Sequence, residues 1–123
     1  MIYTSYFANI RNLPDNIVPV SISRKAPPGY GGLEFKKLAP SYGLLSHWKE
    51  HHDEEYYTKV FKEEVLKKTS PIGLLSELVS LVPEGKDICL ICYEKPESFC
   101  HRHLVSKWLR DCGFDCFEWQ SSK

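Results

Sequence analysis

DICLICYEKPESFCHRHLVSKW, residues 87–108, joins an apolar run to a polar loop and then to the start of a helix. The run of residues 88–92 is apolar on both pleat faces, which is typical of a central strand covered on each side. The first turn of the following helix holds Cys100, His101 and Arg102. A thiol, an imidazole and a guanidinium therefore meet where a helix offers unpaired N–H groups. Such a place suits the binding of an anion or the activation of a thiol.

Other segments of the chain alternate between strand and helix patterns. Aromatic and β-branched residues predict strands at 2–7, 17–22 and 115–119, and Pro19 favours an edge position or a strand end for the second of these. Apolar residues at helical spacing predict four helices, and Asp53 and Ser70 are the expected N-caps of two of them. These helices are expected at 41–51, 53–68, 70–82 and 98–112.

Strands that are separated by helices pair in parallel through right-handed crossovers. The length of 123 residues, 42% of them hydrophobic, fits one domain with a modest core. We therefore expect a single small α/β domain over residues 1–123, with a mostly parallel sheet of about four strands flanked by helices. This is a Rossmann-like or flavodoxin-like three-layer arrangement.

Charge and cysteine content limit the classes of protein. Sixteen basic residues balance sixteen acidic ones, so the whole-molecule field does not favour tight nonspecific binding to nucleic acid or to an acidic membrane. The start resembles no signal peptide, and no apolar run approaches the roughly 20 residues that span a bilayer. We expect a cytoplasmic protein with no membrane partner. The five cysteines, an odd number, are expected to be free thiols.

Polar side chains follow each predicted strand at its carboxyl end. Arg11 comes after the first strand, Arg24 and Lys25 after the second, and Tyr93 and Glu94 after residues 88–92. Ligands of open parallel sheets bind outside the carboxyl ends of the strands. The three groups are therefore expected to share one edge of the sheet with the start of the last helix.

These residues predict a site for a phosphate-bearing small molecule, a nucleotide or a nucleic-acid end. Cys100, Glu94 and His101 are the candidate catalytic residues, as nucleophile and general base. The candidate anion- and ligand-binding residues are Arg102, Arg24, Arg11, Lys25 and Tyr93. The sequence does not identify a cofactor.

Each group also has a structural interpretation. His101 and Arg102 are equally suited to capping the loop after residues 88–92 by bonding Glu94 and backbone carbonyls. Cys89 and Cys92 are interpreted as small buried hydrophobes. They should project to opposite faces of a strand, so no zinc site of the finger type is expected there. A metal site made by Cys92 with Cys100 and His101 stays open.

One more histidine belongs to the same predicted helix. His103 aligns with Lys107 and Arg110 on the solvated side of the helix, so we assign it no role in the site.

The same residues carry a family resemblance. A short apolar strand followed by Cys-x-Glu, a proline loop and Cys-His-Arg resembles the signature of the DUF488 family, with Cys92, Glu94 and residues 100–102 as the matching positions. The opening MIYTSYF and the segment VSISRKAPPGY are similar to its first two strands, and residues 38–66 are similar to its YeaO-like branch. The resemblance implies this fold and this site, but no reaction, because the family is named for having no established function.

Two other function classes remain. The same edge of the sheet would serve a binding module that recognises a nucleotide or nucleic acid without turnover, with Tyr30, Trp48 and Tyr93 stacking on bases. A small protein-interaction or modulator protein is compatible with the size and neutral charge.

Overall fold

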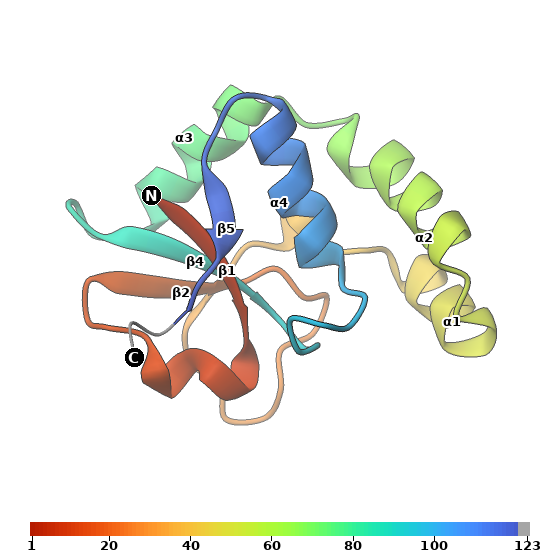
Figure 1. Ribbon diagram of the computed structural model, residues 1–123, viewed down its shortest axis with the longest axis horizontal. Coiled ribbons are helices and arrows are strands. Elements are labelled where there is room, and N and C mark those ends of the chain that lie inside the picture. Colours follow the sequence, from red (N-terminus) through yellow and green to blue (C-terminus); the bar gives the residue numbers. More distant parts are fainter. Residues whose placement is uncertain (121–123) are drawn as a thin grey trace.

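A five-stranded parallel sheet forms the centre of the computed structural model, in which residues 1–120 are described (Figure 1). Its strands are β1 (Ile2–Tyr6), β2 (Ile17–Ser21), β3 (Leu33–Glu34), β4 (Asp87–Cys92) and β5 (Cys116–Glu118). They lie in the order β3-β2-β4-β1-β5, and every pair is parallel. The predicted parallel α/β domain is confirmed, and the strand beyond the four expected is the two-residue β3.

Strand β4 is central because it pairs with β1 on one side and β2 on the other. Tyr6 lies opposite Cys92, and Ser21 lies opposite Ile91. All residues of β4 from Ile88 to Cys92 are buried, as a strand apolar on both faces requires. The carboxyl ends of the three strands consequently lie at one edge of the sheet.

Pro19 lies inside β2, although proline cannot donate to a ladder. It sits opposite Cys89 of β4, and β3 pairs only with Val20 and Ser21. The Pro19 carbonyl faces the β3 side, where it accepts a 3.4 Å bond from the Tyr30 hydroxyl. At Pro19, the side of β2 that faces β3 therefore has no partner among the described strands, in agreement with the edge position predicted for this residue.

Three of the four α-helices begin directly after a residue whose side chain caps them. The helices are α1 (Tyr42–His51), α2 (Glu54–Phe61) continued by the π-helical turn η3 (Lys62–Leu66), α3 (Pro71–Leu81) and α4 (His101–Asp111). The side chains of Ser41, Asp53 and Ser70 each accept a bond from the backbone N–H three residues later. Two 3-10 segments, η1 (Phe7–Asn12) and η2 (Lys36–Leu38), complete the described elements.

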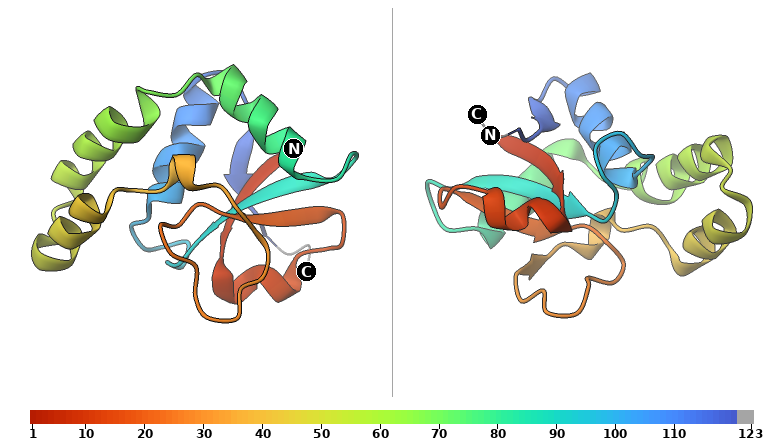
Figure 2. Two further views of the ribbon diagram at one scale, coloured as in Figure 1. Left: turned by 180° about the vertical axis from the view of Figure 1, so that it is seen from behind. Right: turned by 60° about the horizontal axis from the view of Figure 1, so that its bottom comes forward.

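The two faces of the sheet are covered differently (Figures 1 and 2). The α-helices cover the face that carries Ile88, Leu90 and Cys92, and α4 packs against β1, β4 and β5. The other face, with Cys89 and Ile91, is covered by side chains of η1 and neighbouring segments, which are Tyr3, Phe7, Ile10, Leu13 and Trp119. The third layer of the predicted arrangement is therefore a short 3-10 segment.

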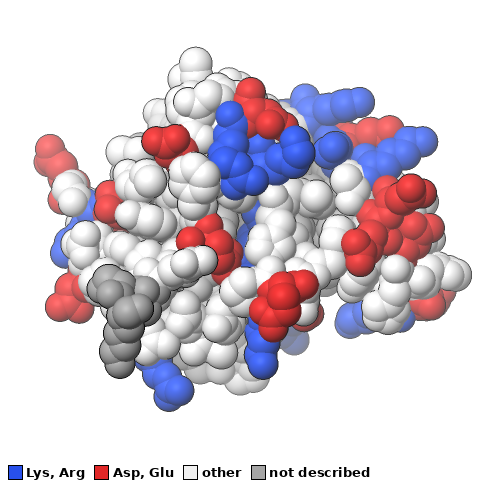
Figure 3. Space-filling view, in the orientation of Figure 1, with Lys and Arg blue, Asp and Glu red and all other residues white. Residues whose placement is uncertain are grey.

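The surface mixes both signs of charge. In the view of Figure 3, lysines and arginines lie among aspartates and glutamates over α2 and α4. The Lys107–Asp111 pair on α4, at 2.8 Å, is one such exposed contact. No helix within residues 1–120 has the length and apolar character to cross a membrane.

Candidate functional site

A cavity of about 630 Å³ opens at the carboxyl edge of β2 and β4, and we call it the rim cavity. Ser23, Arg24 and Lys25 reach it from the end of β2, and Cys92, Tyr93 and Glu94 reach it from the end of β4. Cys100 and His101 close it at the start of α4, while α1 supplies the far wall. Two of the three predicted strand exits therefore meet the start of the last helix in one cavity.

Arg11 belongs to a different place. It is exposed on η1 and lines a separate hollow of about 660 Å³ with Phe7 and Tyr30, over the opposite face of the sheet. The end of β1 lies at this edge as predicted, but the chain then forms η1 on the opposite face of the sheet, and Arg11 lies within η1. The structure thus does not bring Arg11, or the predicted stacking residue Tyr30, to the rim cavity.

Cys100 is the N-cap residue of α4, one position before the first helical residue, His101. The Cys100 backbone is extended, and among the described residues no side chain caps this helix end. The first turn of an uncapped helix has backbone N–H groups for which the helix itself provides no acceptor. The Cys100 side chain and the helix end both face the rim cavity.

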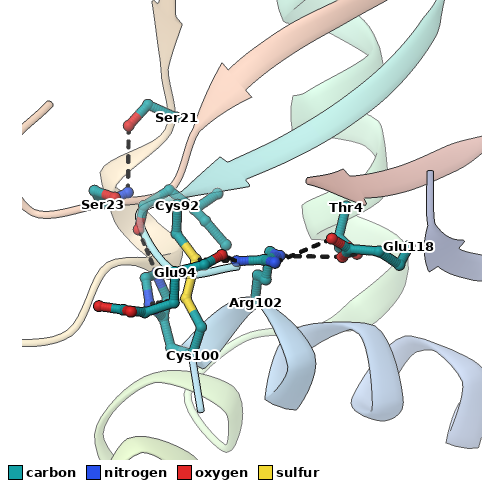
Figure 4. The surroundings of a disulfide bond; sticks show 10 residues. Thr4, Ser21, Ser23, Cys92, Glu94, Cys100, Arg102 and Glu118 are labelled. Atoms are coloured by element: carbon teal, nitrogen blue, oxygen red, sulfur yellow. Dashed lines mark hydrogen bonds and ion pairs between the residues drawn. A yellow bond between two sulfur atoms is a disulfide. The ribbon is translucent and has the colours of Figure 1, made fainter. Parts of the chain in front are cut away.

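Cys92 and Cys100 are joined by a disulfide between the end of β4 and the start of α4 (Figure 4). The expectation of free thiols is therefore wrong for this pair, and Cys92 is more than a small core residue. The reason is topological: the loop after β4 turns back so that residues eight apart in sequence face each other. Cys89, Cys112 and Cys116 are free, and Cys89 lies on the opposite face of the sheet from Cys92, as predicted.

His101 is held in one tautomer by the backbone. Its Nε2 lies 2.8 Å from the Ile22 carbonyl oxygen, which can only accept, so Nε2 carries the proton. Its Nδ1 lies 3.9 Å from the Cys100 sulfur. Burial lowers the pKa of His101 from 6.5 to about 4, and the Arg102 charge adds to the effect. The ring is consequently neutral at pH 7 and presents an unprotonated Nδ1 to the cysteines.

Arg102 is fully buried, is not among the residues that line the rim cavity, and points toward Thr4 and Glu118 (Figure 4). Its Nε and Nη2 donate to the two carboxylate oxygens of Glu118 at 3.1 and 3.0 Å. Its Nη1 donates to the Glu94 carbonyl and, at 3.1 Å, to the Cys92 sulfur. The side chain thus makes the loop-capping contacts of the structural interpretation, and it does not line the cavity that Arg24 and Lys25 reach.

Glu118 and Thr4 are parts of this arrangement that the sequence does not reveal. The Thr4 hydroxyl donates to the Glu118 carboxylate at 2.7 Å, next to the guanidinium of Arg102. A glutamate near the end of the chain and a threonine near its beginning become neighbours only because β5 pairs with β1. Nothing in their local sequence indicates the contact.

Ser23 has an unpaired hydroxyl at the rim cavity. The residue is 3% exposed, and its Oγ has no hydrogen-bond partner among the described residues. Buried hydroxyls normally find a partner, because leaving one unpaired costs about 1–3 kcal/mol. The Ser23 hydroxyl is therefore a buried polar group without a partner beside the rim cavity.

Two cations accompany Ser23. Arg24 is half-buried, with Nε 2.9 Å from the Pro40 carbonyl and its guanidinium over the Tyr42 ring. Its Nη1 has no partner in residues 1–120. Lys25 is exposed at the cavity, and its carbonyl accepts a bond from the Tyr93 hydroxyl, which ties the β2 exit to the β4 exit.

The far wall of the rim cavity is aromatic and basic. The Trp48 and Phe99 rings lie 4.8 Å apart, and Tyr57 lies edge-on to Phe99. Lys49 and His52 stand beside them at the end of α1. The sequence marks Trp48 as a candidate stacking residue, but it does not indicate that α1 faces the strand exits, so Lys49 and His52 are missed.

The remaining predicted residues occupy the mouth of the cavity or lie outside it. Glu94 is exposed on the loop after β4, and Tyr93 is half-exposed with its ring against Phe7. His103 does not line the cavity, as expected. It is only partly exposed, however, and its Nε2 is buried.

Comparison with protein families identifies a matching family model. A family model described as DUF488-N3a, the active DUF488-N3 subclade, matches residues 7–113. This range includes β2, β4, the loop after β4 and the whole of α4. The predicted family is confirmed, while the finer likeness to the YeaO-like branch stays a prediction. Searches of curated proteins and of solved structures give no match.

Removing the Arg102 side chain should strongly destabilise the protein. Arg102→Ala leaves the Glu118 carboxylate and the Glu94 carbonyl without their donor in a buried place, which costs about 3–5 kcal/mol. Urea unfolding measures the effect. The exposed Lys107→Ala variant, which removes one partner of a surface pair, should lose less than about 1 kcal/mol. Equal losses in the two variants would show that the Arg102 contacts do not stabilise the fold.

Stability should fall in acid because of His101. In metal-free protein, the unfolded chain takes up a proton on this residue near pH 6.5, whereas the folded protein resists protonation down to about pH 4. Stability from this group is complete above pH 6.5 and declines as the pH drops toward 4, by an amount on the order of 3 kcal/mol. His101→Gln should flatten this part of the unfolding-energy profile, and the exposed His51→Gln variant should not. An unchanged slope in His101→Gln would contradict the assignment.

Proposed function

Because the chain belongs to the DUF488 family, which implies a fold and a motif but no reaction, we propose a function from the rim cavity itself. The cavity binds a phosphate-bearing small molecule, a nucleotide or a nucleic-acid end, and the Cys100, His101 and Glu94 side chains act on it. The description of the matching subclade as active supports catalysis over binding alone. The cytoplasmic location stays a prediction.

The proposal rests on the unpaired Ser23 hydroxyl, which belongs to the same cavity as the Arg24 guanidinium and the uncapped start of α4. Ser23 Oγ, Arg24 Nη1 and the first turn of α4 all offer hydrogen bonds at one cavity. Phosphate oxygens accept bonds from this set of donors, and a helix N-terminus favours negative charge. A bound anion would thus accept hydrogen bonds from donors that have no acceptor within the described part of the protein.

Local charge at the rim cavity supports the same ligand. Lys25 and Lys49 join Arg24 as cations, and Glu94 is the acidic residue that lines the cavity. The chain as a whole is neutral. The excess of positive charge is therefore local, and it attracts an anionic ligand to this cavity rather than to the whole surface.

The aromatic wall favours a ligand with a flat ring. Trp48, Phe99 and Tyr57 contact one another and all line the cavity. Aromatic side chains stack on nucleobases with about 1–3 kcal/mol per base and little sequence preference. A nucleotide would place its phosphate on Ser23 and Arg24 and its base near Trp48.

Besides the phosphate donors and the aromatic wall, the cavity holds the candidate catalytic side chains. When reduced, Cys100 is the nucleophile, and the His101 Nδ1 lone pair 3.9 Å away accepts a hydrogen bond from the thiol. Glu94, at the exposed mouth, is placed to act as a general base toward water. The disulfide with Cys92 removes the nucleophile, so turnover requires the reduced pair.

Titration calorimetry of reduced, metal-free protein tests the ligand class. Inorganic phosphate, a nucleoside monophosphate and a short 5′-phosphorylated oligonucleotide are the probes, and binding should weaken as salt is raised. Arg24→Ala should lower the affinity about tenfold, because a charge-assisted hydrogen bond is lost. Arg11→Ala, which removes a cation from the separate hollow, should have no effect. Failure of all three probes to bind, or equal losses in both variants, would overturn the proposal.

The same samples separate catalysis from binding. Product formation detected by phosphorus NMR and chromatography, and abolished in Cys100→Ser, would support an enzyme. Binding that depends on Arg24 without any product would instead support the non-catalytic binding module.

A further inference from the structure

Three soft or borderline metal-ligand atoms converge at the floor of the rim cavity. The sulfurs of Cys92 and Cys100 and a ring nitrogen of His101 all lie within 4.8 Å of one another. All three residues are buried. Thiolates and imidazoles are the ligands that zinc prefers, and two cysteines with one histidine form a known type of catalytic zinc site.

We propose that, in the reduced protein, Cys92, Cys100 and His101 bind one borderline-soft divalent cation of the zinc type. This inference goes beyond the anion site, and it holds whether or not the rim cavity binds a phosphate. In the metal-bound protein Cys100 and His101 are ligands, so the nucleophile and acceptor roles proposed above belong to the reduced, metal-free protein.

The histidine is prepared for this role by its second nitrogen. Metal-bound imidazoles almost always donate their other N–H to a carbonyl or carboxylate, which fixes the ring. His101 has this contact through Nε2 and the Ile22 carbonyl, at 2.8 Å. Nδ1 is then the free nitrogen, and it faces the Cys100 sulfur.

The surroundings of Cys92 suit a thiolate. Arg102 Nη1 lies 3.1 Å from the Cys92 sulfur, and its other donors are fixed by Glu118 and the Glu94 carbonyl. A guanidinium that donates to sulfur stabilises negative charge on it. The contact provides an outer-shell partner for the second ligand, as Ile22 does for the histidine.

The spacing leaves room for an ion. The Cα atoms of Cys92 and Cys100 are 7.4 Å apart, wider than the roughly 4.4–6.8 Å of most disulfides. Zinc–sulfur bonds of about 2.3 Å in a tetrahedral site hold two sulfurs about 3.8 Å apart. All three ligands line the rim cavity, so a fourth position would face it and accept water or an anion.

Loading the site consumes two electrons. A dithiol or phosphine reductant transfers two electrons to the Cys92–Cys100 disulfide and is itself oxidised, while the sulfurs take up two protons. Both protons are released when the two thiolates bind the cation. The oxidised protein has no thiolate to offer, so it should not bind the ion.

Cobalt(II) titration of phosphine-reduced protein under nitrogen, in phosphate-free buffer, tests the inference. One Co²⁺ per chain should bind with thiolate-to-cobalt charge-transfer bands and the visible bands of a tetrahedral ion, and Zn²⁺ should displace it. The disulfide form of the same wild-type chain should show neither the charge-transfer bands nor the visible bands. This comparison needs no substitution and therefore does not depend on a variant that folds.

Variants assign the ligands. Cys92→Ser, Cys100→Ser and His101→Asn, checked for folding by circular dichroism, should each lower the cobalt affinity at least tenfold. Cys112→Ser, at an exposed free cysteine, and His51→Ala, which breaks up the exposed His47–His51 pair, should leave it unchanged. Absent charge-transfer bands, bands in the oxidised protein, or full binding by Cys92→Ser would overturn the inference. Calorimetry with phosphate is run without metal, so failure of the anion site would leave these results intact.

Discussion

The buried guanidinium of Arg102 is the contact on which the arrangement of the rim depends. One fully buried side chain on the first turn of α4 bonds both carboxylate oxygens of Glu118 on β5 and the backbone of the loop after β4. The Thr4 hydroxyl on β1 completes the set by donating to the same carboxylate. Three strands and the last helix are thereby joined at one point.

A buried charge is costly unless its partners are complete. Removing a guanidinium from water costs several kcal/mol, which is offset only when its donors find acceptors of suitable geometry. Arg102 meets this condition with a two-point carboxylate contact, a carbonyl and a sulfur. Because these acceptors come from different elements, the start of α4 has little freedom to move relative to β4. Cys100 and His101 are held at the rim cavity as a consequence.

Local patterns explain why much of the fold could be predicted. The capping residues Asp53 and Ser70 lie directly before the helices that they mark, and the apolar run of β4 identifies the central strand. Strand exits in a parallel sheet share an edge, which placed Arg24, Lys25, Tyr93 and Glu94 near Cys100. Pairing over long distances has no such signature. Such distant pairing produces three features of the site, which are the Arg102–Glu118 contact, the Cys92–Cys100 disulfide and the approach of α1 to the cavity.

Arg11 illustrates the limit of the strand-exit rule. The rule identifies the edge of the sheet, but not the face to which the next segment turns. The chain after β1 forms the 3-10 segment η1 on the face opposite the α-helices, and Arg11 goes with it. The chain after β2 instead places Ser23 and Arg24 on the side of Cys100. Only tertiary packing distinguishes these two outcomes.

Arg102 thus holds the end of β4 and the start of α4 together, with Cys92 facing Cys100. Mild oxidation of the reduced protein by oxidised glutathione, followed by peptide mapping without reduction, tests this claim directly. We expect a Cys92–Cys100 crosslink, with Cys89, Cys112 and Cys116 still free. A crosslink that involves one of these three cysteines, or no crosslink between Cys92 and Cys100, would contradict it.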